Sequence, residues 1–155
     1  MADTQVTTVE TGPRRVSRRV VVDATPAEVF ALAADPRRHG ELDGSGTVRD
    51  SVKAPDTLSK GAKFSVSMKM YGVPYRITST VVDFEPDRVI EWRHPMGHTW
   101  RWELAPVSPG QTEVVETFSY GTHVLPKALE LVGVPKMNGT GITRTLEKLQ
   151  QRFAS

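Results

Sequence analysis

The sequence contains no cysteine and no apolar run that approaches the length of a membrane-spanning helix. Without cysteine there is no disulfide framework and no thiol chemistry, which suits a reducing cytoplasm. The chain also lacks a hydrophobic signal segment at its start. Its 20 Lys and Arg against 18 Asp and Glu leave a net charge of +2, too small to indicate a nucleic-acid partner. We therefore expect a cytoplasmic protein with no membrane span and no nucleic-acid partner.

The length of 155 residues predicts one domain. The first stretch, MADTQVTTVETGPRR, shows no apolar periodicity, which is typical of a tail outside the folded part. We expect residues 1–15 to form a disordered tail and residues 16–155 to form the domain.

The N-terminal part of the domain predicts a strand followed by a helix. Residues 17–24, SRRVVVDA, are rich in branched apolar residues, as strands are. In TPAEVFALAADP, Thr25 can cap a helix, and Glu28 completes a capping box. Asp35-Pro36 ends this helix, and residues 37–46 then form a second short helix or an irregular connection.

Beyond residue 46 the sequence predicts consecutive strands and then a long helix. Short connections of turn residues between the strands favour antiparallel pairing. The six strands predicted here cover residues 47–53, 63–71, 73–86, 90–94, 98–104 and 112–120. Over residues 126–152 the apolar spacing becomes helical, with interruptions at Gly133 and Pro135. Gly139 and Gly141 are expected to remove side chains where this helix faces the sheet.

These elements predict an α+β domain: a seven-stranded curved antiparallel sheet wrapped on a long C-terminal helix, with two short helices between the first two strands. One amphipathic helix is too narrow to cover a sheet of this length, which must curl. The rest of the concave face is either filled by side chains or left as a pocket. The residues expected to bind a ligand there are Phe30, Val66, Met68, Met70, Tyr75, Ile77, Trp92, Trp100, Trp102, Phe118, Tyr120, Met137, Asn138 and Ile142.

The stretch IEWRHPMGHTWRWEL, residues 90–104, predicts a hairpin that holds all three tryptophans. A loop over residues 95–97, with glycine in the left-handed position, closes it. This register places the large rings on one face and an ion pair on the other, whereas a two-residue loop would mix the faces. The predicted cross-strand pairs are Trp92–Trp100, Ile90–Trp102 and Glu91–Arg101.

The same register makes His94 and His98 cross-strand neighbours, with Cβ atoms roughly 5 Å apart. On a helix this spacing would be a metal motif, but Pro95 breaks a helix here, and we reject that motif. Two arrangements stay open: a hairpin tip with both rings partly in water, or both rings pointing inward at the mouth of a pocket, able to bind a ligand or move protons. A zinc site would need a third protein ligand, and we expect no metal and no cofactor.

Glu116 shares its strand phase with Val114 and Phe118 and could point into the interior, where a carboxylate has to be paired or carry a raised pKa. The opposite phase would place Glu116 in water, and both phases stay open. The candidate catalytic residues are His94, His98, Glu116 and Tyr75.

The order of elements, with VVVDATPAEVFALAADP at the front and NGTGITRTLEKLQQRF at the back, resembles the helix-grip proteins of the START-like, or SRPBCC, superfamily. Over residues 17–153 the chain is similar to the bacterial polyketide cyclase/dehydrase and lipid-transport group. The resemblance implies a cavity between sheet and final helix that holds a small apolar or amphipathic molecule, and it carries over no catalytic residue. The chain departs from the group in RRHG, residues 37–40, where members often have an aromatic residue, and this departure affects the rim of the pocket.

A cavity of this kind is compatible with three classes of function. The favoured one is a carrier or sensor that binds a small hydrophobic molecule such as a lipid, a quinone or a polyketide-like compound. The second is a polyketide aromatase/cyclase-type enzyme that uses His, Glu and Tyr acid–base groups. The third is a protein-interaction module with an exposed apolar groove. The protein is expected to be a monomer or a homodimer.

Overall fold

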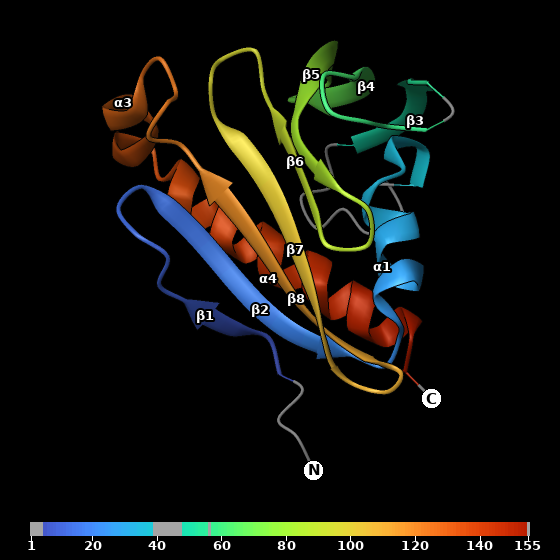
Figure 1. The fold of residues 1–155 in the computed structure, drawn as a ribbon. Helices are drawn as coiled ribbons and strands as arrows, with labels where there is room; N and C mark the ends of the chain where they lie inside the picture. Colours follow the sequence, from blue (N-terminus) through green and yellow to red (C-terminus); the bar gives the residue numbers. More distant parts are fainter. Residues whose placement is uncertain (1–4, 39–47, 56, 155) are drawn as a thin grey trace.

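The described part of the chain forms one curved antiparallel sheet with a long helix across one face (Figure 1). This computed structural model describes residues 5–38, 48–55 and 57–154, except the side chains of residues 37, 48–52 and 68–70. The strand order is β1-β2-β8-β7-β6-β5-β4-β3. The strands are β1 (Thr7–Val9), β2 (Arg15–Val22), β3 (Val48–Lys53), β4 (Lys63–Met70), β5 (Val73–Glu85), β6 (Val89–Arg93), β7 (Thr99–Ser108) and β8 (Gln111–Ser119). The helical segments are α1 (Pro26–Ala33), the 3-10 helix η1 (Pro36–Arg38), α3 (Pro126–Leu131) and α4 (Val134–Arg152). The predicted α+β helix-grip architecture is confirmed.

Strand β1 lies in the stretch for which the sequence predicts a disordered tail. Thr7–Val9 pair antiparallel with residues 17–19 of β2. The hydroxyl of Thr11 then shares a hydrogen bond of 2.7 Å with the hydroxyl of Ser17, which also lies 2.7 Å from the hydroxyl of Thr117 on β8. Residues 7–11 are therefore fixed to the sheet, which has one strand more than the seven predicted. The pairing goes through backbone and hydroxyl groups, which leave no apolar pattern in the sequence.

Helix α1 begins with the predicted capping box. The Oγ1 of Thr25 accepts a hydrogen bond from the backbone N–H of Glu28 at 3.2 Å, and the Glu28 carboxylate accepts one from the backbone N–H of Thr25 at 3.4 Å. These bonds satisfy N–H groups that the first turn of a helix leaves without a partner. Val29, Phe30 and Ala33 are buried, and α1 lies against β7 and β8.

The connection from α1 to β3 is described as far as Arg38. It begins as η1, which partly matches the second short helix predicted over residues 37–46. Residues 39–47 lie outside the described residues, and so does the side chain of Arg37. Of RRHG, only Arg38 is described with its side chain, so the rim that this stretch was expected to form lies mostly outside the described residues.

The predicted C-terminal helix is divided into α3 and α4. Gly133 (φ 79°) is the N-cap of α4, and Pro135 lies in its first turn, where proline fits. Gly139 is buried, and a Cβ there would lie 2.6 Å from Nη2 of Arg18 on β2. The expectation that glycine lets the helix approach the sheet is confirmed at Gly139. At Gly141 an added Cβ would meet nothing within 4 Å, so that reason does not apply there.

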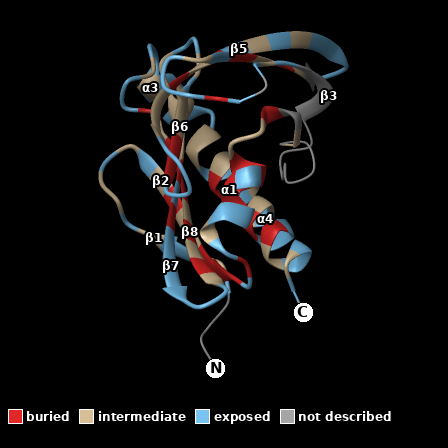
Figure 2. Ribbon diagram, turned by 45° about the vertical axis from the view of Figure 1, so that its right-hand side comes forward, coloured by how far each residue is buried: buried red, intermediate tan, exposed pale blue. Residues whose placement is uncertain are grey.

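The core lies between the helices α1 and α4 and the face of the sheet that they cover, which we call the inner face (Figure 2). Helix α4 lies mainly against β2 and also contacts β8. Because side chains alternate across a strand, every second residue of β8 points to this face. These buried inner-face residues are Thr112, Val114, Glu116, Phe118 and Tyr120.

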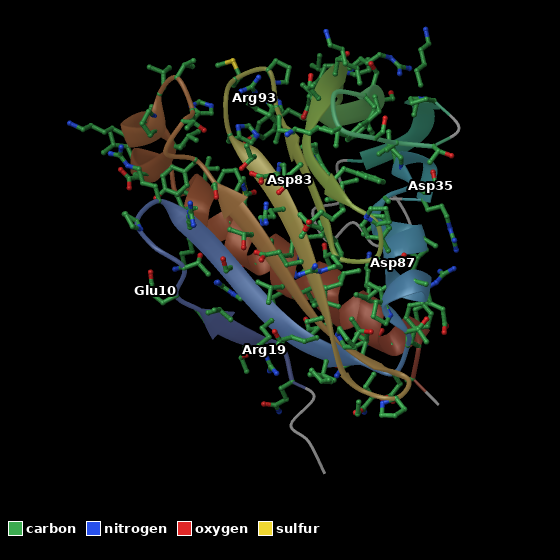
Figure 3. The ribbon with its side chains drawn as sticks, viewed as in Figure 1. Glu10, Arg19, Asp35, Asp83, Asp87 and Arg93 are labelled. Carbon is green, nitrogen blue, oxygen red and sulfur yellow. The ribbon has the colours of Figure 1, made fainter. Side chains whose placement is uncertain are left out.

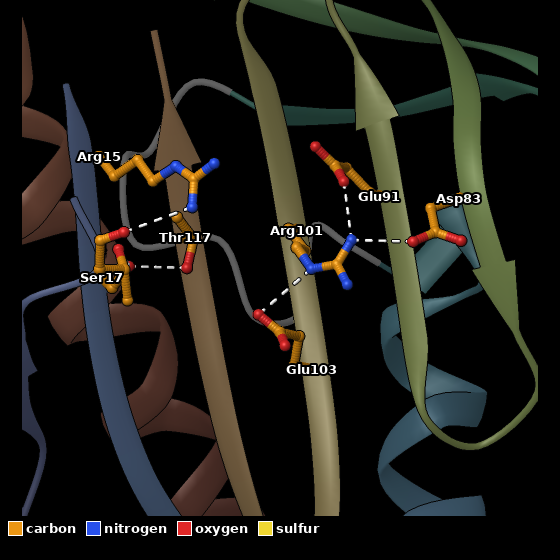
Figure 4. A network of polar contacts seen from close by, with 8 residues as sticks. Arg15, Ser17, Asp83, Glu91, Arg101, Glu103 and Thr117 are labelled. Atoms are coloured by element: carbon orange, nitrogen blue, oxygen red, sulfur yellow. Dashed lines mark hydrogen bonds and ion pairs between the residues drawn. The ribbon is translucent and has the colours of Figure 1, made fainter. Parts of the chain in front are cut away.

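The outer face of the sheet is polar. Arg101 on β7 donates hydrogen bonds to Asp83 on β5 and to Glu91 on β6, both at 2.9 Å, and forms an ion pair of 3.2 Å with Glu103 (Figure 4). Asp83 and Glu91 are directly opposite each other in the sheet, and Arg101 offsets their repulsion. Because these side chains are partly exposed, each pair contributes at most about 1 kcal/mol to stability.

Candidate ligand-binding site

The β6–β7 hairpin has the predicted register. The cross-strand pairs are Trp92–Trp100, Ile90–Trp102 and Glu91–Arg101. The N–H of His94 donates to the carbonyl of His98 at 2.8 Å, which leaves a loop of residues 95–97 with Gly97 at φ 107°. Glycine adopts such a backbone at low steric cost. All three tryptophans therefore point to the inner face.

The three tryptophans differ in burial. Trp102 is 4% exposed, whereas Trp92 and Trp100 are half-buried. The ring of Trp100 packs on Phe118 with centroids 4.8 Å apart, and the ring of Trp92 meets Phe64 edge-on at 5.7 Å. These contacts fix both half-buried rings and leave part of each accessible.

The predicted ligand-binding residues divide into two groups by how far their side chains are buried. A side chain with so little exposed area contributes little surface to a ligand cavity in this conformation. Residues of this kind form the closed group: Phe30, Val66, Trp102, Phe118, Tyr120 and Ile142. The half-buried residues of the inner face form the open group: Tyr75, Ile77, Trp92 and Trp100. The open group lies toward the ends of β5, β6 and β7 that meet the β4–β5 and β6–β7 turns.

The remaining predicted ligand residues lie on α4 and β4. Asn138 is half-buried one turn before the buried Ile142, whereas Met137 is 60% exposed. The structure therefore places Asn138, but not Met137, on the side of α4 that approaches the sheet. The side chains of Met68 and Met70 lie outside the described residues.

His94 and His98 form part of a stack of imidazole rings at the tip of this hairpin. Their ring centroids lie 4.2 Å apart, and His98 also stacks on His123 at 5.3 Å. Phe118 packs against His98 at 5.3 Å from below the tip. We call His94, His98 and His123 the histidine stack. Within the described ranges no three His, Asp or Glu side chains are placed to hold a metal ion.

The environment of the stack keeps its middle ring neutral. Burial, and to a smaller extent the charges of His94 and His123, lower the pKa of His98 to about 3. Burial and the charge of His123 also lower the pKa of His94. The Nδ1 atoms of His94 and His123 accept hydrogen bonds from the N–H groups of Met96 (3.0 Å) and Leu125 (2.8 Å). The buried Nδ1 of His98 has no hydrogen-bond partner among the described residues. A base with so low a pKa is a weak proton acceptor at neutral pH.

Sequence reasoning missed His123 and the loop that carries it. The Oγ1 of Thr122 donates to the carbonyl of Gly97 at 2.6 Å, and the N–H of Val124 donates to the carbonyl of Met96 at 2.9 Å. A Cβ on Gly97 would overlap the carbonyl oxygen of Thr122. The only available signal was the register of β7 and β8, which brings the residues after β8 to this tip once Trp100 is set opposite Phe118.

The structure decides the strand phase of Glu116. Its side chain is buried on the inner face, so the inward phase is correct. Its register partners are Arg18 on β2 and Trp102 on β7. Polar groups thus interrupt the apolar inner face where β2, β8 and β7 lie side by side.

The candidate catalytic residues are distributed over the sheet. Glu116 lies opposite Trp102, and the row formed by Trp100 and Phe118 separates it from His98. Four residues of strand span roughly 13 Å, so Glu116 is beyond hydrogen-bond reach of His98. Tyr75 lies on β5, with β6 and β7 between it and β8.

Comparison with known proteins identifies the family. The family model described as polyketide cyclase / dehydrase and lipid transport matches residues 13–154. The chain belongs to this family. The Mycobacterium tuberculosis protein Rv0088 is 52% identical over 153 residues, which cover 96% of this chain and 68% of the relative. The resemblance to the SRPBCC polyketide cyclase-like group is confirmed.

Solved structures of similar fold extend over nearly the whole chain. A Rhodobacter sphaeroides protein matches with a TM-score of 0.73 and 20% identity, over 97% of this chain and 98% of that one. The Polyketide_cyc-like protein Cgl2372 of Corynebacterium glutamicum matches with a TM-score of 0.60 and 20% identity, over 89% and 90%. At this identity the likeness shows the fold alone. Among the described residues, the helices of this family member are too short or too polar to cross a bilayer.

Proposed function

We propose that this protein binds a small hydrophobic or amphipathic molecule against the open group of its inner face. The observation that carries the proposal is the partial exposure of Trp92 and Trp100 on the face that elsewhere forms the core. Ligand sites are mostly apolar and aromatic with a few polar anchors. Ile77 adds apolar surface, and Tyr75 adds a hydroxyl on the same face.

The composition of the site favours a flat or elongated ligand with one polar end. Aromatic rings bind flat apolar groups by offset stacking or edge contact. Asn138 on α4 and the Tyr75 hydroxyl are the polar groups that could anchor the other end. Lipids, quinones and aromatic polyketides share this chemistry, and the fold family supports ligand binding of this general kind.

A carrier or sensor agrees better with the structure than an enzyme does. Acid–base catalysis in which two side chains act on one substrate needs both of them within hydrogen-bond reach of the reacting atoms. Here the Trp100–Phe118 row lies between Glu116 and His98, and burial holds the pKa of His98 at about 3. The polyketide aromatase/cyclase alternative therefore requires a substrate that bridges separated groups.

Native mass spectrometry and thermal-shift screening with lipids, quinones and aromatic polyketides test the proposal. We expect at least one class to bind the wild type and Ile77→Ser to weaken binding about tenfold, because a polar group then faces the apolar ligand. Val107→Ser, at an exposed site on β7 away from the open group, is the matched control. The proposal fails if no class binds, or if both variants weaken binding equally. Turnover of a polyketide that His98→Ala abolishes would favour the enzyme instead.

A further inference from the structure

Helix α3 and the segments beside it form an exposed apolar surface that the ligand site does not use. Helix α3 has no buried residue. Leu131 at its end is 88% exposed, and the following Val132 is 75% exposed. The exposed apolar residues of this region, which we call the α3 patch, are Met96, Val124, Leu125, Leu131, Val132 and Met137. Single exposed apolar residues are ordinary, but a set gathered around one short helix marks an interaction site.

Backbone hydrogen bonds hold the segments of the α3 patch beside one another. The N–H of Val124 donates to the carbonyl of Met96 at 2.9 Å, which joins the loop before α3 to the β6–β7 tip. Gly133 ends α3 and begins α4, and its carbonyl accepts the N–H of Met137 at 3.1 Å. Figure 1 shows α3 at the edge of the molecule, on the side of the β6–β7 turn. The exposed Leu131 and Val132 lie at the end of α3, directly before Gly133.

Basic side chains surround the patch. Lys127 on α3, Lys136 on α4 and Arg93 at the end of β6 are all exposed, and Figure 3 places Arg93 beside the β6–β7 tip. In residues 93–98 and 122–137 the sequence has a single acidic residue, Glu130. Its carboxylate accepts a hydrogen bond from the Tyr120 hydroxyl at 3.0 Å and lies 3.5 Å from the guanidinium of Arg14.

We propose that the α3 patch docks on the surface of an anionic lipid bilayer. Apolar side chains on a projecting turn can enter the boundary between headgroups and acyl chains, while flanking Lys and Arg contact anionic headgroups. Glu130 is engaged by Tyr120 and Arg14, so the charge offered by the rim of the patch is positive. A positively charged rim favours a negatively charged surface as the partner of the patch.

A second copy of the chain fits the same patch less well. In a symmetric dimer each patch would face its own equivalent, so Lys127, Lys136 and Arg93 of two copies would approach one another. Like charges placed opposite each other across an interface are unfavourable.

Flotation with vesicles tests the docking. The vesicles are phosphatidylcholine alone or equimolar phosphatidylcholine and phosphatidylglycerol. We expect the wild type to float with the anionic vesicles, and to bind them much less in high salt or without phosphatidylglycerol. The double variant Leu131→Ser/Val132→Ser should lose at least about tenfold in vesicle binding, because two apolar anchors are removed. Lys127→Gln/Lys136→Gln should lose binding to anionic vesicles specifically.

The controls separate docking from folding, from ligand binding and from self-association. Leu131 and Val132 are so exposed that their replacement leaves the fold intact, which circular dichroism verifies. Val107→Ser and Ile77→Ser should bind vesicles like the wild type, and equal losses in them would overturn the proposal. So would a wild type that binds no vesicle, or a dimer in analytical ultracentrifugation that Leu131→Ser/Val132→Ser disrupts. Because Ile77→Ser alters the proposed ligand site and leaves the α3 patch unchanged, its vesicle binding separates docking from ligand binding.

Discussion

The open group and the sheet residues of the closed group lie on the same face of the same sheet, yet they differ in what covers them. The closed group includes Phe118, which is 1% exposed and lies on β8, where α1 and α4 both make contacts. The open group lies toward the strand ends near the β6–β7 turn, where Trp92 and Trp100 keep accessible surface. The strand residues of both groups follow the same alternation along their strands. Strand periodicity therefore tells which side chains face the helices, and helix placement decides which of those become core and which keep accessible surface.

The largest effect should come from the centre of the closed group. Phe118→Ala removes a ring that packs against Trp100, His98 and Tyr120. We expect a loss of about 3–5 kcal/mol in the free energy of unfolding, measured by chemical denaturation, because a buried ring leaves a cavity. A loss under about 1 kcal/mol would show that Phe118 is not core and would remove the distinction between the groups.

Gly97→Ala should have the next largest effect, at the tip that bounds the open group. Gly97 has φ 107°, and an added Cβ would overlap the Thr122 carbonyl, so we expect a loss of about 3 kcal/mol. Gly110→Ala is the matched control, since Gly110 has φ 76° and nothing within 4 Å of an added Cβ. It should lose about 1 kcal/mol from backbone strain alone. Equal losses would show that the tip is not tied to the loop after β8.

The histidine stack should make stability depend on pH. The pKa of His98 is about 3 in the folded protein against 6.5 for an ordinary histidine, so the unfolded chain takes up this proton first as the pH falls. The neutral His98 ring therefore contributes fully to the stability of the fold above about pH 6.5, and this contribution is lost as the pH falls toward 3. Between about pH 7 and pH 5, the free energy of unfolding should fall by about 1 kcal/mol more in the wild type than in His98→Phe. This figure allows for the solvent exposure of the ring.

Urea denaturation of both proteins at several pH values measures this difference. His98→Phe keeps a ring in the stack and removes the buried Nδ1, which no described residue meets with a hydrogen bond. At neutral pH its free energy of unfolding should be the same as that of the wild type or up to about 1 kcal/mol higher. Parallel pH curves for the two proteins would mean that His98 titrates normally.

The smallest effect on stability should come from Ile77→Ala in the open group. Because Ile77 is half-buried, the loss should be below about 1 kcal/mol, whereas Ile142→Ala in the closed group should lose about 3 kcal/mol. The two variants remove the same atoms, so their difference in denaturation midpoints compares the groups directly. Equal losses would contradict the division.

Much of the fold could be predicted because its signals are local. The capping box of Thr25 and Glu28 and the hairpin register of Trp92 with Trp100 each depend on residues close in sequence. Gly139 could be expected to let the helix pack closely on the sheet, although the residue that it packs against, Arg18, could not be identified from the sequence. Local propensity and turn geometry carry this information, and tertiary contacts did not override it.

The site was harder to predict because it depends on distant parts of the chain. Nothing local distinguishes Trp102 from Trp100, yet one is buried and the other is not. The stacking of His123 on His98 requires the full register of β7 and β8. The exposure of Val132 was also unpredictable, since an apolar residue at helical spacing is typical of a buried face.

The pairing of β2 with β8 has a consequence for synthesis on the ribosome. The hydroxyls of Ser17 and Thr117 meet although 100 residues separate them, and β2 lies between β1 and β8 in the sheet. At about 5–20 residues per second, translation takes roughly 5–20 s to supply this partner. During that interval the nascent β2, with its apolar residues Val20–Val22, has an unpaired edge that can pair with any other strand. Chaperones at the exit tunnel prevent such pairing.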